Sequence, residues 1–227
     1  MTILVTGVSR GIGRAMIIEF AKKGYDVIGI TRSIEGIDAE IKSNPRMHLI
    51  EFDWENYVGL ISKLEKLKLP TIDILINNAA SIIIAELIHT TTEDLNRMMK
   101  ANVLGPLKLT QTLINSKKLS SGCHVVNISS MAGYQGSSKF AGLGAYSMSK
   151  SALVCLTECM AAEWGDFITP NCLCLGAVNT EMLKTAFPDY KAPVDDVEMA
   201  SFICEFSLSS KTIVHGQVFS IKKSDPN

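Results

Sequence analysis

The chain has 227 residues, of which 47% are hydrophobic, and its 22 basic and 23 acidic residues give a formal net charge of -1. This length and hydrophobic content suit one α/β domain with a sizeable core. Because the charges are balanced and scattered, nothing in the composition indicates a nucleic-acid partner.

The cysteines and histidines show no ligand-type spacing. None of the six cysteines belongs to a Cys-x-x-Cys pair, so we expect buried free thiols, with Cys172 and Cys174 on alternate sides of a strand. The four histidines are far apart in the sequence, and we therefore expect no metal site.

The beginning of the chain reads as a strand. Residues 1–7 contain a three-residue apolar run and no basic segment, which argues against a secretory signal. No apolar run approaches the ~18 residues of a membrane helix. We therefore expect a cytoplasmic protein without a membrane segment.

Apolar runs alternate with amphipathic segments along the whole chain. The runs predict strands at residues 3–5, 26–30, 47–52, 72–76, 124–128, 169–175 and 217–221, and several are β-branched, as is typical of central strands buried on both faces. The amphipathic segments predict helices at residues 12–23, 54–67, 93–116, 145–167 and 195–208, the third with a capping signal at residues 90–94. This order predicts a doubly wound parallel α/β sheet of the Rossmann type, in a single domain over residues 1–227.

A glycine-rich turn connects the first predicted strand to the first predicted helix. Glycines let the backbone approach a pyrophosphate, and a helix N-terminus offers free N–H groups and positive potential. The spacing is G-x-x-x-G-x-G rather than the commoner G-x-G-x-x-G, and a plain tight turn is the alternative. The turn predicts a dinucleotide site that includes Gly7, Ser9, Arg10, Gly11, Ile12 and Gly13.

The end of the second predicted strand bears on the choice of cofactor. An enzyme that prefers NAD usually has an acid about 20 residues beyond the glycines to hold the ribose 2′-hydroxyl. This chain has Thr31-Arg32-Ser33 there, and no acid precedes Glu35. Arg32, together with Arg10, suits a 2′-phosphate clamp, although two exposed arginines are the simpler interpretation. We therefore expect NADP(H), with NAD(H) as the alternative.

A tyrosine and a lysine four residues apart suggest acid–base chemistry. Tyr146 and Lys150 share one face of a predicted helix. A cation within ~4–6 Å favours the phenolate and lowers a tyrosine pKa from its usual value of about 10. Tyr146 could then act as an acid or a base near neutral pH, with a hydroxyl from Ser129 or Ser130 holding a carbonyl oxygen.

These segments together resemble the short-chain dehydrogenase/reductase family, and the resemblance covers almost the whole chain. It rests on seven segments in family order: the glycine turn, Asp53, Asn77-Asn78-Ala79-Ala80, Asn102, Ser129-Ser130, Tyr146-x-x-x-Lys150, and Asn171 through Leu175-Gly176 to Thr180. It implies an enzyme that moves a hydride between a nicotinamide cofactor and a carbonyl or secondary alcohol. It also implies an NADP-type protein similar to the 3-oxoacyl reductases.

The resemblance implies roles for single residues. Ser130, with Ser129 as the fallback, would orient and polarise the substrate oxygen, and Tyr146 would exchange the proton. Lys150 would lower the Tyr146 pKa and bind the nicotinamide ribose, while Asn102 would hold a water in a relay towards Lys150. The implied cofactor set further comprises Asp53 at the adenine, Asn78 and Ala79 near the adenine-side ribose, Thr180 at the carboxamide, Gly176 and Val178.

Three of these positions have structural alternatives. Asn102 could be a buried asparagine that caps a strand end, and Asp53 could be a helix N-cap. We expect Asn77 to tie neighbouring strands together rather than to contact a ligand.

The chain departs from the family pattern in four places. Ala80 replaces a usual glycine, Leu175 replaces a usual proline, and the C-terminus lacks the acidic Gly-Gly ending that often supports tetramers. The glycine-rich segment between Ser130 and Tyr146 is expected to form a flexible flap over the substrate. The expected pocket side chains are Met131, Phe140, Met182, Phe187 and Tyr190.

Two functions from different classes remain. The first is an oxidoreductase with a small-molecule substrate, forming a homodimer or homotetramer through its long helices. The second is a nucleotide-sensing regulatory or scaffold protein that has kept the fold and lost turnover. A nucleotide-sugar epimerase would normally need a longer chain.

Overall fold

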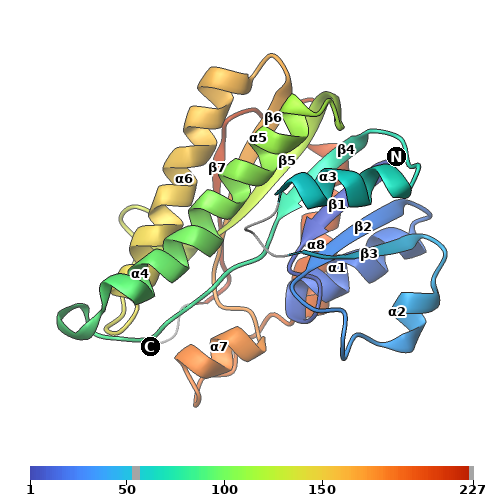
Figure 1. Cartoon of the computed structure of the whole chain (residues 1–227). Helices are drawn as coiled ribbons and strands as arrows, with labels where there is room; N and C mark the ends of the chain where they lie inside the picture. Colours follow the sequence, from blue (N-terminus) through green and yellow to red (C-terminus); the bar gives the residue numbers. More distant parts are fainter. Residues whose placement is uncertain (53–56, 225–227) are drawn as a thin grey trace.

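The computed structural model describes residues 1–52 and 57–224. Seven strands form one parallel sheet, as predicted, and their order is β3-β2-β1-β4-β5-β6-β7 (Figure 1). They are β1 (Thr2–Thr6), β2 (Asp26–Thr31), β3 (Met47–Glu51), β4 (Ile72–Asn77), β5 (Leu119–Ser130), β6 (Ile168–Leu175) and β7 (Val218–Ile221).

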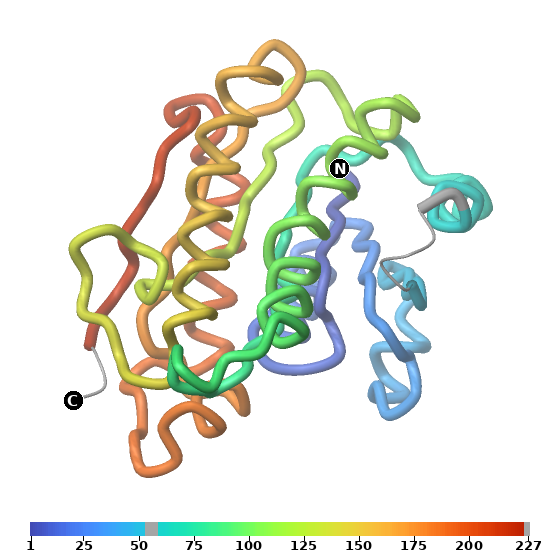
Figure 2. Tube along the Cα trace, turned by 60° about the vertical axis from the view of Figure 1, so that its left-hand side comes forward, coloured from blue at the N-terminus to red at the C-terminus, as the bar shows by residue number. Residues whose placement is uncertain are grey.

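Helices cover both faces of the sheet, as a doubly wound fold requires. The helices of at least eight residues are α1 (Gly11–Lys22), α3 (Tyr57–Lys66), α4 (Thr92–Met99), α5 (Gly105–Asn115), α6 (Gly144–Trp164) and α8 (Asp196–Ser209). One buried apolar cluster joins α1 and α8 to the sheet, and a second joins α3, α5 and α6 to its other face. Figure 2 shows the long helix formed by α4 and α5 running beside α6 along the second face.

The alternation of side chains in β1 explains the two clusters. Ile3 and Val5 pack into the cluster with α1 and α8, whereas Leu4 packs into the cluster with α3 and α5. All three are fully buried, because a strand with helices on both sides has no solvent-facing surface. This is why such strands read as unbroken apolar runs.

The predicted helix over residues 93–116 contains an irregularity. It begins at α4, whose N-cap Thr91 and third residue Asp94 form a capping box. Residues Lys100–Leu104 then form a π-helical turn, after which α5 continues with Pro106 in its first turn. A π-turn inserts one residue into the helical ladder, and such insertions are frequent at functional sites.

Several expectations about short elements and thiols were wrong. The short helices α2 (Ala39–Ser43) and α7 (Glu181–Ala186) were not predicted, and β5 begins at residue 119 rather than 124. Cys155 and Cys159 are exposed on α6, whereas the other four cysteines are buried. Cys172 and Cys174 lie on the same side of β6 in one apolar cluster, because residues two apart in a strand share a face.

Within the described residues, no helix is long and apolar enough to span a membrane. The four predicted helices other than the third agree with α1, α3, α6 and α8 to within about three residues at their described ends. Residues 54–56 of the second predicted helix, and Asp53 before it, lie outside the described residues.

Candidate active site

The main cavity lies at the carboxyl ends of the strands and has a volume of about 630 Å³. Strand order reverses between β1 and β4, and doubly wound sheets bind ligands in the crevice at such a switch point. Of the predicted cofactor residues within the described chain, all line this cavity: Gly7, Ser9, Arg10, Gly11, Ile12, Gly13, Arg32, Asn78, Ala79, Tyr146, Lys150, Gly176, Val178 and Thr180. The predicted adenine contact Asp53 lies outside the described residues.

The glycine turn has the geometry of a phosphate cradle. Gly7 and Gly11 adopt φ values of +74° and +54°, which favour glycine. A Cβ on Gly7 would lie 2.8 Å from the Ala79 Cα, and one on Gly13 would lie 2.1 Å from the Gly7 carbonyl oxygen. No side chain of the described residues caps the N-terminus of α1, so its first N–H groups are available to an anion. The turn therefore fits a dinucleotide pyrophosphate.

Asn78 and Thr6 hold the glycine turn in place. The Thr6 hydroxyl oxygen accepts hydrogen bonds from the backbone N–H groups of Asn78 and Ala79, both at 3.0 Å. The Asn78 amide donates to the carbonyl oxygens of Thr6 and Gly7 at 3.0 and 3.2 Å. The strand ends β1 and β4 are thereby joined directly beneath the predicted phosphate position.

Asn77 ties strands together, as expected. Its amide donates to the Asn127 side-chain oxygen at 2.8 Å, which connects β4 to β5. Asn127 in turn donates to the Thr157 hydroxyl on α6 at 2.9 Å. These buried amides fix the helix that carries Tyr146 against the sheet.

The two arginines of the predicted 2′-phosphate clamp differ in their surroundings. The Arg10 guanidinium forms an ion pair with Glu181 on α7 at 2.5 Å, and both side chains are largely exposed. Arg32 follows the end of β2, lines the cavity, and forms no ion pair with any residue that the structure describes. The glycine turn and α7 are therefore joined across the cavity by a solvent-accessible charge pair.

Tyr146, Lys150 and Ser130 lie together at the end of the cavity nearest β5. Tyr146 is in the first turn of α6 and is 7% exposed. The Lys150 ammonium lies 5.9 Å from the centre of the Tyr146 ring and donates to the Ile128 carbonyl oxygen at 2.8 Å. The Ser130 hydroxyl interacts with the Tyr146 phenol and lowers its pKa.

The geometry distinguishes the two adjacent serines. The Ser129 hydroxyl is buried and donates to the Lys150 carbonyl oxygen at 2.9 Å, inside the contact between β5 and α6. The Ser130 hydroxyl caps the short helix of residues Met131–Gly133, accepts from the Ala132 N–H at 3.1 Å, and reaches Tyr146. Successive strand residues point to opposite sides, so only one serine can face the phenol.

Burial is the main cause of the pKa shifts of Tyr146 and Lys150. Burial raises the pKa of Tyr146 to about 12, and the hydrogen bond from Ser130 offsets part of this rise. Burial lowers the pKa of Lys150 to about 8. In this structure the pKa of Tyr146 is raised rather than lowered, so the expectation that Lys150 brings it below its usual value does not hold, and desolvation of the phenolate is the main cause.

Asn102 is fully buried and does not line the cavity. It lies in the π-turn, where its side chain accepts from the Ser81 N–H at 2.7 Å and donates to the Ser81 carbonyl oxygen and the Ser149 hydroxyl, both at 2.9 Å. The Ser149 hydroxyl donates to the Tyr146 carbonyl oxygen at 2.7 Å. The Asn102 amide thus connects α4–α5, the segment after β4 and α6.

Most of the expected substrate-pocket side chains line the cavity. Met131, Phe140, Met182 and Phe187 do so, but Tyr190 does not, because its hydroxyl lies 2.6 Å from the Ser224 hydroxyl. Other residues that line the cavity belong to no recognisable sequence motif, because only the tertiary fold brings them there. They include Thr31, Phe52, Ser81, Ile82, Arg97, Lys100 and Leu143.

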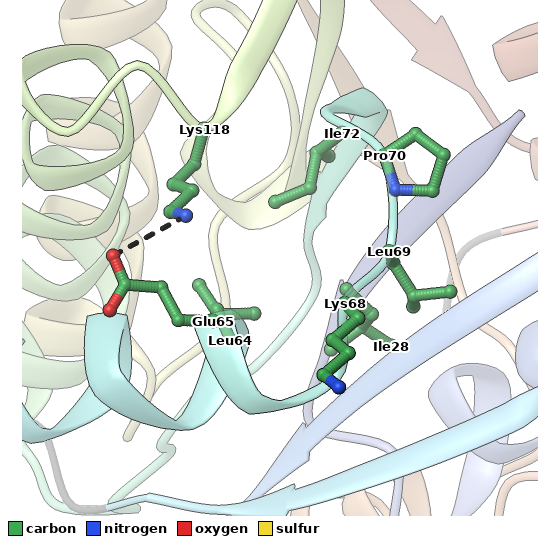
Figure 3. Close-up of a pocket in the computed structure, with 8 residues that line it drawn as sticks. All are labelled: Ile28, Leu64, Glu65, Lys68, Leu69, Pro70, Ile72 and Lys118. Atoms are coloured by element: carbon green, nitrogen blue, oxygen red, sulfur yellow. Dashed lines mark ion pairs between the residues drawn. The ribbon is translucent and has the colours of Figure 1, made fainter.

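A second, smaller hollow of about 270 Å³ lies near the amino ends of β4 and β5 (Figure 3). Its lining is Ile28, Leu64, Glu65, Lys68, Leu69, Pro70, Ile72 and Lys118, and Lys118 pairs with Glu65 at 3.5 Å. This lining combines an apolar floor with partly exposed surface charges. Within the described part of the chain, no group of three or more His, Cys, Asp or Glu side chains could hold a metal ion.

Comparisons with known proteins agree with this architecture. The family described as "short chain dehydrogenase" matches residues 1–191. The chain is 32% identical over 193 residues to a farnesol dehydrogenase of Aedes aegypti, covering 79% of this chain and 78% of the relative. It is also 32% identical over 204 residues to an NADPH-dependent pterin aldehyde reductase of Arabidopsis thaliana, covering 85% and 82%.

Solved structures of similar proteins contain nicotinamide cofactors. A 4-hydroxyisoleucine dehydrogenase mutant complexed with NADH and succinate superimposes with a TM-score of 0.85 at 25% identity, covering 97% of this chain and 96% of the other. ElxO with NADP bound superimposes with a TM-score of 0.82 at 28% identity and the same coverage.

Proposed function

This chain belongs to the short-chain dehydrogenase family, and from that premise we propose that it transfers a hydride between NADP(H) and a carbonyl or secondary alcohol. Membership makes it an oxidoreductase that acts on CH–OH or C=O groups and uses a nicotinamide cofactor. The observation that carries the proposal is the placement of Ser130, Tyr146 and Lys150 at one end of a cavity whose other end is the glycine turn. When bound, the nicotinamide supplies or accepts the hydride.

The acid–base roles follow from the surroundings of each group. With its pKa raised to about 12, the Tyr146 phenol holds its proton at neutral pH and can donate it to a carbonyl oxygen during reduction. The Ser130 hydroxyl, already beside the phenol, orients and polarises that oxygen. In the oxidative direction Tyr146 accepts the alcohol proton, and the nearby Lys150 ammonium stabilises the phenolate.

In this proposal, Tyr146 exchanges its proton with solvent by way of Lys150. The ammonium donates one hydrogen bond to the Ile128 carbonyl oxygen, which leaves further N–H groups for the cofactor ribose and for water. Because the Asn102 side chain is fully engaged with Ser81 and Ser149, we assign any contact with a relay water to the Asn102 carbonyl oxygen. The side chain itself is a positioning group.

NADP(H) is the preferred cofactor in this proposal. Arg32 lines the cavity just after β2, where an acid would mark a preference for NAD, and Arg10 lies in the glycine turn. Asp53 is proposed at the adenine, Asn78 and Ala79 at the adjacent ribose, and Gly176, Val178 and Thr180 beside the nicotinamide.

Tyr146→Phe tests the mechanism. The variant keeps the ring that packs beside Lys150 and removes the proton donor, so we expect turnover to fall by about 10²–10⁴-fold while NADPH affinity stays within about twofold. The matched control is Tyr25→Phe, which removes a hydroxyl on the opposite side of the sheet. Turnover by Tyr146→Phe at the wild-type rate would contradict the mechanism. Cofactor binding without consumption across a broad carbonyl panel would instead favour a nucleotide-sensing role.

We also propose that the protein forms a homodimer or homotetramer. Helices α4–α5 and α6 run side by side, and both Leu104 and Met148 are exposed on this surface, at 46% and 54% (Figure 2). A cytoplasmic location and similarity to 3-oxoacyl reductases remain predictions. Sedimentation at micromolar concentration, with Leu104→Glu as the disrupting variant, tests the assembly.

A further inference from the structure

We infer that the substrate is an uncharged, largely apolar carbonyl compound with an aromatic ring, enclosed by Phe140 and Phe187. The inference rests on the proposed function, because it concerns the part of the same cavity that adjoins Ser130 and Tyr146. It adds the chemical class of the substrate and the two side chains that select it.

The walls of this part of the cavity come from three segments. The short helix after β5 contributes Met131, the segment that leads into α6 contributes Phe140 and Leu143, and α7 with the residue after it contributes Met182, Leu183 and Phe187. All six side chains are apolar. Two of them are methionines, whose sulfur atoms make favourable contacts at the edges of aromatic rings.

Phe140 and Phe187 meet above the cavity. Their ring centres lie 5.2 Å apart with an interplanar angle of 77°, the edge-to-face geometry that aromatic pairs prefer. Phe140 belongs to the flap and Phe187 follows α7, so this contact closes the two segments over the Tyr146 end of the cavity. A ring entering beneath them gains the same kind of edge-to-face contact.

In the part of the cavity that the structure describes here, the hydroxyl groups suit a single substrate oxygen. Among the described lining residues here, Ser130 and Tyr146 carry the hydroxyls proposed to hold the substrate oxygen, whereas the Thr185 hydroxyl donates to the Glu181 carbonyl oxygen at 3.0 Å. A polyhydroxylated substrate would leave several hydroxyls without partners, each at a cost of about 1–3 kcal/mol.

Apart from Lys150, which lies beside Tyr146, and Glu181, at the start of α7, the charged lining residues of the cavity lie on other segments. Arg10 and Glu181 pair with each other, Arg32 follows β2, and Arg97 and Lys100 are on the α4 side. The flap supplies no charged lining residue. A carboxylate on the substrate ring would be buried against these methionine and phenylalanine side chains, which opposes binding.

Apolar side chains also pack at the base of the flap. Ile84 and Leu87, exposed at 43% and 65%, pack against the backbone of Gly142 and Gly144 at the base of the flap. The Ala85 N–H donates to the Gly142 carbonyl oxygen at 3.0 Å.

A matched pair of aldehydes tests the inference. We expect kcat/KM for 2-naphthaldehyde with NADPH to exceed that for 6-carboxy-2-naphthaldehyde by at least about a hundredfold. Phe187→Ala should lower kcat/KM for 2-naphthaldehyde by about tenfold and leave the value for propanal within about threefold. The control Phe167→Ala removes a phenylalanine that is 58% exposed and outside the cavity, and should change neither value.

A binding measurement separates this inference from the proposed function. Calorimetry with 2-naphthamide, which is uncharged and not reduced, should show binding to the Tyr146→Phe protein in the presence of NADPH, weakened about tenfold by Phe187→Ala. Such binding without Tyr146-dependent turnover of any aldehyde by the wild type would contradict hydride transfer and keep the substrate class. Tyr146-dependent turnover that favours the carboxylated aldehyde, glyceraldehyde or acetoacetyl-CoA would overturn the substrate class and keep hydride transfer.

Discussion

Lys150 is a buried cation whose position has a measurable energetic cost. It is 2% exposed, and burial lowers its pKa from 10.5 to about 8. Neighbouring Cys172 and Cys174 oppose this shift only in part. The difference corresponds to roughly 3 kcal/mol of free energy that the folded state loses while the ammonium is charged.

Lys150→Met is therefore expected to stabilise the protein and remove its activity. The apolar side chain fills a similar volume without a buried charge, so the free energy of unfolding at pH 7 should rise by about 1–3 kcal/mol. In the wild type, the unfolded state keeps the lysine proton between pH 8 and 10.5 while the folded state loses it, so wild-type stability rises through that window. Urea unfolding at pH 7 and pH 10 should show the variant's advantage shrinking, and a destabilised variant at pH 7 would contradict this account.

Spacing along the sequence predicted some features of the site but not others. The i, i+4 relation of Tyr146 and Lys150 predicted their shared helix face, because helical geometry is local. The choice between Ser129 and Ser130 depended on which side of β5 faces α6, and that is fixed by packing between distant segments. Likewise, the raised pKa of Tyr146 follows from burial, which no local pattern reports.

At the scale of elements, the ion pair between Arg10 and Glu181 joins the glycine turn to α7. The pair spans 171 positions in the sequence, and a Cβ on Gly11 would lie 3.6 Å from the Thr180 methyl group, so α7 begins close against the turn. In the proposed NADP(H) site, Glu181 would compete with the cofactor 2′-phosphate for the Arg10 guanidinium. Because both side chains are exposed, the competition is worth at most about 1 kcal/mol.

Glu181→Gln is expected to strengthen NADPH binding. Freed from the carboxylate, Arg10 can bind the 2′-phosphate, so the Kd for NADPH should fall by up to about fivefold while the Kd for NADH changes little. The matched control is Glu205→Gln, which breaks the exposed pair with Lys23 at 2.5 Å elsewhere on the surface. Calorimetric titration with each cofactor measures the effect, and equal shifts for NADPH and NADH would show that Arg10 does not contact the phosphate.

Long elements were predictable and short ones were not. All seven strands were predicted, and in a central strand such as β1 two-sided burial leaves an unbroken apolar signature. The five-residue helix α2 and the π-turn at Lys100–Leu104 depend on tertiary contacts, such as the Asn102 amide bonding to Ser81, rather than on propensity. The same contacts bring Arg97 and Lys100 to the cavity without a motif.

At the scale of the whole molecule, buried His124 connects four segments. Its Nδ1–H donates to the Ser207 carbonyl oxygen on α8 at 2.9 Å, and its Nε2 accepts from the Asn171 amide on β6 at 3.1 Å. Asn171 also donates to the Val214 carbonyl oxygen and accepts from the Gln217 N–H, which fixes the orientation of its amide. The neutral imidazole fits this network, whereas a protonated Nε2 would face another donor.

Stability is therefore expected to fall in mild acid because of His124. Burial lowers the pKa of His124 below 6.5, and the Lys211 charge adds to this effect. The unfolded chain takes up the proton first, so the contribution is complete above pH 6.5 and is lost as the pH falls below it. When the pH is lowered from 7.5 to 5, the urea concentration at the unfolding midpoint should fall for the wild type and for the exposed control His89→Gln. It should not fall for His124→Gln. A pH-dependent His124→Gln profile equal to the wild type would assign the effect to other groups.

The flap of residues 134–143 is fastened at both ends by close backbone packing. A Cβ on Gly133 would lie 2.4 Å from the Lys150 carbonyl carbon, and one on Gly144 would lie 2.5 Å from a Leu87 methyl group. These two close contacts hold the ends of the loop, while Phe140 and Leu143 within it line the cavity. We therefore expect that a different loop between Gly133 and Gly144 would change which substrates the enzyme accepts and leave cofactor binding unchanged. The same segment could diverge in evolution without loss of the cofactor site.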